Sequence, residues 1–214
     1  GTIATLDSAF GISGTPSLAV HPTGDAFVTW RQGTGADDRI WAADFDAVNG
    51  WDPPTFLTDS GSLASRNPAA AFAGDDVFAL WTQNYLLGTA GTLTTGIFGK
   101  VAANGAAFGA TEQLDPMTSS TDRARVVAAV NRGAAAWIQD DLVLVDEWTG
   151  AWGGATAVVT TSDEPLAAFL ATNEDGDRAL LWTAQTLSVD LYAIRYDGLT
   201  HPWGPVELVA QRAL

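Results

Sequence analysis

Four of the nine tryptophans in this chain of 214 residues stand at matching positions of a repeat, and this repeat constrains the fold more than any other feature. The interval is roughly fifty residues each time. Each of these residues ends a short apolar segment after a tight turn, and a glutamine follows two or three residues later. The four pairs are Trp30 and Gln32, Trp81 and Gln83, Trp137 and Gln139, and Trp182 and Gln185. A unit of about fifty residues with four strands is typical of one blade of a β-propeller.

The segment that ends in tryptophan is apolar on both of its faces in several units, for example at 77–81 and 179–182. A strand with one solvated face would instead alternate apolar and polar residues. Strands that are apolar on both faces are expected between two other sheets, as inner blade strands are. No segment holds the apolar period of a helix for three turns. We therefore predict an all-β β-propeller built from four four-stranded blade repeats.

The two ends of the chain leave the closure of this propeller open. The predicted organisation is a single domain, 1–214, with blade repeats at 15–60, 66–117, 123–161 and 164–211 and an extra outer strand at 1–8. That strand is surplus, because the last repeat already has an outer strand of its own. The chain is then a closed four-bladed propeller, half of an eight-bladed dimeric ring, or a piece of a longer chain. An open arc exposes an apolar blade face at each end, so it predicts self-association through these faces.

Composition limits the partners of the protein. The net charge is −15, and Lys100 is the only lysine. Such a surface repels phosphate backbones, which argues against nucleic acid. There is no cysteine, no apolar run of membrane-helix length, and no signal-peptide pattern after Gly1. We expect a secreted, periplasmic or cell-surface protein that uses no cofactor.

Metal-binding and catalytic motifs are weak. His21 and His201 lie in predicted turns, and neither has the spacing to carboxylates that a metal site needs. The acidic segment 173–177 lacks the full spacing of a calcium loop, and no nucleophile elbow is present. We therefore assign no metal-ligating and no catalytic residue.

Four carboxylates follow the tryptophan-bearing strands, in the loops before the third strand of their blades. They are Asp37, Asp38, Asp140 and Asp141. Loops on a rigid scaffold often carry ligand sites, although carboxylates are also ordinary turn residues. We take these four as candidate ligand-binding residues. In a glycosidase or lyase they would be the carboxylates to test.

One loop breaks the repeat. The predicted loop at 84–96 in the second unit is longer than its counterpart at 33–39 in the first. It contains Tyr85, Leu86 and Leu87 among glycine and threonine residues. Long loops often carry function, and exposed apolar residues suit a protein contact. These three residues are therefore candidate partner-binding residues.

Nine tryptophans are present, which at first suggests sugar stacking. Almost all of them stand at positions that recur in the repeat, and a residue that recurs in every unit is more simply explained as part of the core. The four tryptophans that end the second strand are therefore predicted to be buried, and their glutamines to be structural. A carbohydrate-binding lectin stays as an alternative function.

The unit from Pro16 to Gln32 resembles repeats of bacterial secreted β-propeller proteins, and is loosely similar to sialidase-like and lectin-like propellers. The resemblance covers about 3–209 and implies the fold more than the function. The S-x-D-x-G-x-x-W box of sialidases is absent at 21–25, where it would fall, and their arginine triad, tyrosine nucleophile and acid have no counterparts. We therefore predict a non-catalytic module for ligand or protein binding or assembly. A lectin and a glycosidase- or lyase-type enzyme are the alternatives.

Overall fold

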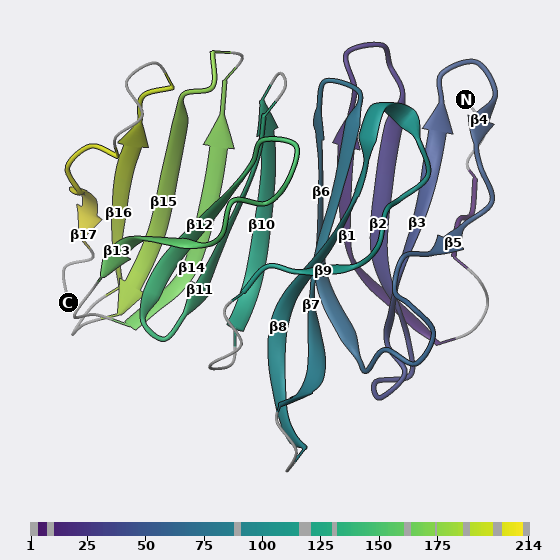
Figure 1. The fold of residues 1–214 in the computed structure, drawn as a ribbon, viewed down its shortest axis with the longest axis horizontal. Helices are drawn as coiled ribbons and strands as arrows, with labels where there is room; N and C mark the ends of the chain where they lie inside the picture. The colour runs from purple at the N-terminus through teal and green to yellow at the C-terminus, as the bar shows by residue number, and fades with distance from the viewer. Residues whose placement is uncertain are drawn as a thin grey trace.

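Four antiparallel β-sheets follow one another along the chain and stand side by side in a row (Figure 1). The computed structural model describes residues 4–7, 11–87, 91–115, 121–129, 132–160, 164–173, 175–185, 189–198 and 203–211. These residues contain no α-helix, and one 3-10 turn, η1 (Ala103–Gly105), precedes the outer strand of the second sheet. The prediction of an all-β chain is confirmed. In the same part of the chain, no helix is long and apolar enough to cross a membrane.

Within each sheet the strands are added in sequence order, from the inner strand outwards. The first sheet consists of β1 (Ile12–Val20), β2 (Ala26–Gly33), β3 (Arg39–Asp46) and an outer strand split into β4 (Gly50–Trp51) and β5 (Thr55–Phe56). The second consists of β6 (Ser65–Ala73), β7 (Asp76–Leu87), β8 (Thr92–Ala102) and β9 (Glu112–Gln113). The third consists of β10 (Thr121–Ala129), β11 (Arg132–Gln139), β12 (Leu142–Trp148) and β13 (Thr156–Thr160). The fourth consists of β14 (Glu164–Thr172), β15 (Arg178–Gln185), β16 (Val189–Tyr196) and β17 (Glu207–Gln211).

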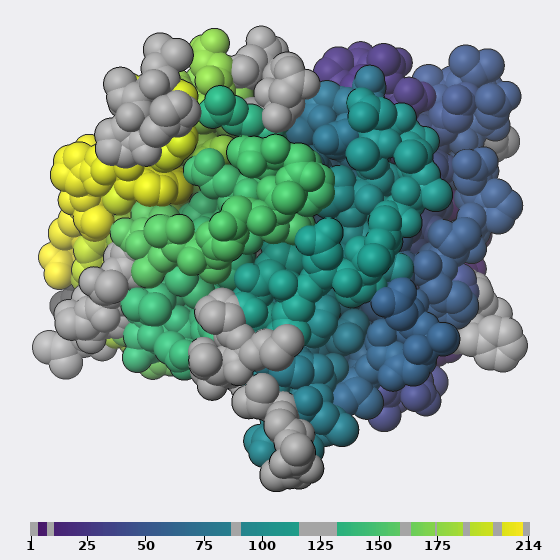
Figure 2. Space-filling model, in the orientation of Figure 1, coloured from purple at the N-terminus to yellow at the C-terminus, as the bar shows by residue number. Residues whose placement is uncertain are grey.

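The row is open at both ends. The inner strands β1, β6, β10 and β14 contact one another in that order. The first and fourth sheets lie at opposite ends of the row, as the purple-to-blue and yellow ends show in both views (Figures 1 and 2). The described part of the expected extra outer strand, residues 4–7, forms no strand. At each end of the row, one sheet face is therefore covered by no other sheet among the described residues.

In the second, third and fourth sheets, the tryptophan of the second strand packs against the preceding sheet. Trp81 is 0% exposed and packs with Phe27 and Ile40 of the first sheet. Trp137 packs in the same way against the second sheet, and Trp182 against the third. The prediction that these tryptophans belong to the core is confirmed. Each interface between neighbouring sheets thus contains one fully buried indole ring from the second strand of the later sheet.

The glutamine after the tryptophan has the predicted structural role in the first two sheets. Residues i and i+2 of a strand lie on the same face, so the amide reaches the indole. The indole nitrogen of Trp81 donates to Gln83 Oε1 at 3.1 Å, and Trp30 donates to Gln32 Oε1 at 3.2 Å. In the fourth sheet Gln185 stands at i+3 and so on the opposite face. The indole nitrogen of Trp182 has no hydrogen-bond partner among the described residues.

The prediction of a long loop at 84–96 is wrong, because most of this segment belongs to two paired strands. Strand β7 continues to Leu87, and β8 begins at Thr92, with Tyr85 opposite Thr94 and Leu86 opposite Leu93. The additional residues therefore lengthen two paired strands into a hairpin that protrudes beyond the other sheets (Figure 1). Threonine and leucine accept extended backbone readily, so a lengthened ladder satisfies backbone groups that a loop would leave to water.

Candidate binding site

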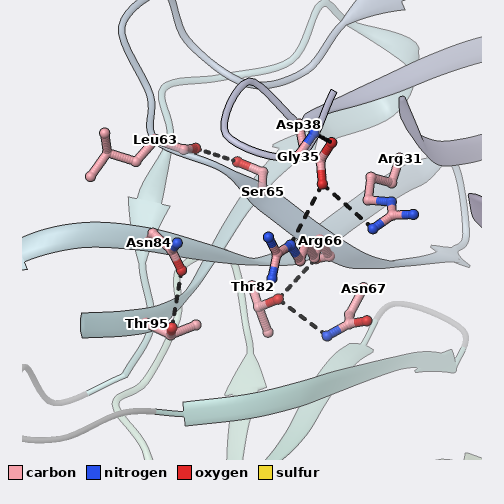
Figure 3. A network of polar contacts seen from close by, with 10 residues as sticks. All are labelled: Arg31, Gly35, Asp38, Leu63, Ser65, Arg66, Asn67, Thr82, Asn84 and Thr95. Atoms are coloured by element: carbon pink, nitrogen blue, oxygen red, sulfur yellow. Dashed lines mark hydrogen bonds and ion pairs between the residues drawn. The ribbon is translucent and has the colours of Figure 1, made fainter. Parts of the chain in front are cut away.

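Asp38 lies at the centre of a polar network that joins the first and second sheets (Figure 3). Its side chain is buried, and Oδ1 accepts a hydrogen bond from the Gly35 N–H at 2.8 Å. Oδ2 lies 3.4 Å from Arg31 Nη1 and 3.6 Å from Arg66 Nε. Both carboxylate oxygens of Asp38, a predicted ligand-binding residue, therefore already bind groups of the protein.

The network continues along β6 and β7 beside Asp38 (Figure 3). The Ser65 hydroxyl lies 3.1 Å from the carbonyl oxygen of Leu63 and 3.3 Å from Gln83 Oε1. The Thr82 hydroxyl donates to the carbonyl oxygen of Arg66 at 3.0 Å. These bonds fix the sheet that carries Arg66, so the guanidinium reaches Asp38 from a rigid strand.

Asp140 and Asp141 form the turn between β11 and β12. Their φ angles are 49° and 59°, as a two-residue hairpin turn of type I′ requires. Aspartate tolerates this left-handed conformation better than most residues, which explains the pair. Both are exposed on the third sheet, whereas Asp37 and Asp38 belong to the first. The second sheet stands between them, so the four predicted carboxylates do not form one cluster.

The three predicted partner-binding residues are in the protruding hairpin. Tyr85 is half-buried, with its ring 5.8 Å from that of Phe98. Leu86 is 60% exposed beside the exposed Leu93. The side chain of Leu87 lies outside the described part of the chain.

An aromatic recess opens beside Asp37, on the face of the first sheet that no other sheet covers. It has a volume of about 680 Å³ and is lined by Gln32, Gly33, Asp37, Arg39, Trp41, Phe56, Thr58, Ser60 and Gly61. The rings of Trp41 and Phe56 lie 4.0 Å apart between centroids, at an angle of 40°. Trp30 stacks on the other side of Trp41, with centroids 6.5 Å apart. The recess therefore has a preorganised aromatic wall.

Polar groups border this wall. The Thr58 hydroxyl is buried and has no hydrogen-bond partner among the described residues. Gln32 is held by the indole of Trp30, and Arg39 Nη1 donates to the carbonyl oxygen of Asp59 at 2.8 Å. This combination of an aromatic wall with a few fixed polar groups is typical of small-molecule sites.

Of the residues that line the recess, Asp37 was predicted from the sequence as a candidate ligand-binding residue, whereas Trp41 and Phe56, which form the wall, were not. The aromatic wall could have been found by comparing which residues of the third and outer strands pair in each sheet. That pairing joins Trp41 to Phe56 in the first sheet, Phe98 to Gln113 in the second, Leu144 to Ala157 in the third and Tyr192 to Leu208 in the fourth. The first sheet alone has two aromatic rings at this position.

Asp115 is a buried carboxyl of the second sheet that belongs to no predicted site. Its Oδ1 accepts hydrogen bonds from the Ile97 N–H at 3.1 Å and from Gln113 Nε2 at 3.0 Å. Oδ2 is buried and has no hydrogen-bond partner in the described part of the chain. Burial raises the pKa of Asp115 above its ordinary value, although these hydrogen bonds act in the opposite direction.

Asp115→Asn should therefore change the pH dependence of stability. The folded pKa of Asp115 is above the unfolded value of 3.8, so the folded protein binds this proton more tightly. Wild-type stability then falls as pH rises from the unfolded pKa through the folded one, and asparagine has no proton to lose. In urea unfolding, we expect the free energy of unfolding of D115N minus that of wild type to be larger at pH 7 than at pH 4. An equal difference in stability between D115N and wild type at both pH values would contradict this explanation.

Antiparallel four-stranded sheets in a row, with their inner strands side by side, define the class of protein: the fold is of the β-propeller type. Solved structures agree with this. Aleuria aurantia lectin, a six-bladed β-propeller, matches with a TM-score of 0.62 and 10% identity over 92% of this chain and 63% of the lectin. NanB sialidase from Streptococcus pneumoniae matches with a TM-score of 0.64 and 8% identity, over 95% of this chain and 53% of the sialidase.

A protein of unknown function from Dyadobacter fermentans is also similar, with a TM-score of 0.65 and 12% identity over 92% of this chain and 68% of that protein. No protein-family model matches the sequence, and neither does any curated protein. This chain thus spans about half the length of the sialidase and less than two thirds of the lectin. At such identities the likeness establishes the fold alone.

Proposed function

We propose that this chain is a non-catalytic carbohydrate-binding module, and that the recess of the first sheet holds a sugar ring. The observation that carries the proposal is the Trp41 and Phe56 wall in a recess that Asp37 and Arg39 also line. The apolar face of a sugar ring packs on such a wall, and its hydroxyl groups bond the surrounding polar atoms. The volume of the recess, about 680 Å³, is that of a site for a small ligand.

The charge of the protein favours a neutral sugar over an acidic one. The net charge is −15, and Asp37 stands at the rim. Arg39, the basic residue that lines the recess, already donates to a backbone carbonyl. An anionic ligand would therefore meet a repulsive surface without a dedicated cation.

A non-catalytic role is supported by the arrangement of the carboxylates. Glycoside hydrolysis needs two carboxyl groups facing one another across the bond that breaks. Among the predicted residues, Asp38 is bound by two arginines, and Asp140 and Asp141 form a turn on another sheet. Only Asp37 reaches the recess.

The decisive experiment is a glycan array followed by titration, with methyl α-L-fucoside as a neutral probe and 3′-sialyllactose as an acidic probe. We expect binding of neutral glycans and no hydrolysis of either probe. Trp41→Ala should weaken binding of the best neutral glycan at least about tenfold, which corresponds to about 1.4 kcal/mol. Trp51→Ala is the matched control, because Trp51 packs on Phe45 at the other end of β3 and should leave binding unchanged.

Two results would refute the proposal. One is an array on which the folded protein binds no glycan. The other is W41A that binds as tightly as wild type while W51A does the same, since the recess would then take no part. Hydrolysis of 3′-sialyllactose would instead favour the enzyme alternative.

A further inference from the structure

One face of the fourth sheet points away from the row. Its residues occupy positions whose counterparts in the other three sheets are buried. The residue directly before the repeated tryptophan is Thr29, Leu80 or Ala136 in the first three sheets, and each is 0% exposed. In the fourth sheet this residue is Leu181, which is only half-buried. On the neighbouring strand, Leu191 is half-buried too, whereas Ile40, Ile97 and Val143 are fully buried at the matching positions.

The three internal interfaces show what covers such a face. In each of them the covering group is the tryptophan-bearing face of the next sheet, with Trp81, Trp137 or Trp182 at its centre. Among the described residues, no sheet covers the other face of the fourth sheet. A face of the same kind as the other three therefore fits the same kind of partner.

The first sheet carries one more tryptophan-bearing face, and it points away from the row. Trp30 stacks on Trp41 there, and Phe56 continues the aromatic surface and is 59% exposed. Leu18, which pairs with Val28 on this face, is exposed as well. Trp30 is already buried within the single chain, at 6% exposed, and residues 6 and 7 line a small pocket with it, so the uncovered part of this face is centred on Trp41 and Phe56.

We propose that two copies of this chain bind head to tail, the open face of the fourth sheet of one covering the open face of the first sheet of the other. This contact continues the sheet-to-sheet packing already present inside the chain, with the tryptophan-bearing face on one side and the Leu181 face on the other. Exposed apolar faces of this kind mark interaction sites in soluble proteins. The two surfaces differ, so the contact is heterologous, and two of them close a dimer with two-fold symmetry.

The contact also concerns the recess. Because the recess lies on the open face of the first sheet, the fourth sheet of the second copy forms its opposite wall. A site between two sheets then replaces a site open to solvent on one side. The head-to-tail contact itself does not depend on sugar binding.

Two surface variants test the proposal by complementation. Leu181→Glu blocks the fourth-sheet face, and Phe56→Glu blocks the first-sheet face. By light scattering coupled to size exclusion, we expect wild type at twice the chain mass of 22.3 kDa or more, and each variant alone at 22.3 kDa. An equimolar mixture of the two variants should return to twice that mass, because one intact contact remains. Val48→Glu, an exposed apolar residue in a turn away from both faces, is the control and should associate as wild type does.

Several outcomes would overturn the proposal. They are a wild-type monomer at every concentration, a variant that still associates alone, or a mixture that stays monomeric. If L181E does not fold, Val189→Glu on the same face replaces it. Sugar binding by monomeric L181E, in which the recess is intact, separates the failure of this proposal from the failure of the proposed function.

Discussion

Replacing Trp81 with alanine is expected to lower the free energy of unfolding by about 3–5 kcal/mol. Its ring fills the interface between the first two sheets and is 0% exposed. Truncation loses the buried apolar area, leaves a cavity lined by both sheets, and leaves the amide of Gln83 without its indole donor. Urea unfolding followed by circular dichroism measures this loss.

Trp30→Ala is the matched control for this effect. Trp30 occupies the same position of the repeat and makes the same bond to a glutamine, but it lies on the open face. Trp30 is only 6% exposed, but it packs on Trp41 of its own sheet and not on a second sheet, so we expect a smaller loss of about 2 kcal/mol. Both variants are compared in the L181E background so that association does not contribute. Equal losses at the two positions would mean that the interface between sheets is not what Trp81 stabilises.

Asp38→Ala is expected to destabilise the protein by about 2 kcal/mol. The substitution leaves two guanidinium groups and the Gly35 N–H without their acceptor. The loss falls below that of a fully buried ion pair, because the side chains of Arg31 and Arg66 are 30% and 51% exposed and solvent screens them.

Asp37→Ala provides the comparison within the same loop. Asp37 is exposed, and surface substitutions of this kind change stability by no more than about 0.5 kcal/mol. Thermal and urea unfolding of the two variants should therefore differ clearly. A D38A protein as stable as D37A would show that the network in Figure 3 contributes nothing to joining the sheets.

The sequence was sufficient to predict the sheets because their determinants are local. Tryptophan at a fixed interval, a tight turn before it and apolar residues on both strand faces each specify a sheet packed between others. Aromatic residues in the turns before the outer strands pack locally as well: Trp51 packs on Phe45, and Trp203 packs on Tyr196. These features need no knowledge of distant contacts.

The candidate site was harder to predict because it depends on which sheet has no neighbour. Aromatic residues stand at this position in three of the four sheets, as Trp41, Phe98 and Tyr192, yet among them only Trp41 lies on an open face with a second ring opposite it. The hairpin at 84–96 was misread for a related reason. A glycine- and threonine-rich stretch is compatible with both a loop and a lengthened ladder, and only pairing across β7 and β8 decides between them.

The row of sheets has a consequence for the way in which the molecule opens. Each sheet packs against its neighbours in the row, so the total stability is a sum of sheet terms and nearest-neighbour terms, as in a repeat protein. Opening an inner sheet breaks two such interfaces, whereas opening an end sheet of a single copy breaks one. The ends therefore fray at the lowest free energy. The recess lies on one of these end sheets, so a ligand that holds that sheet in place also slows fraying from that end of the row.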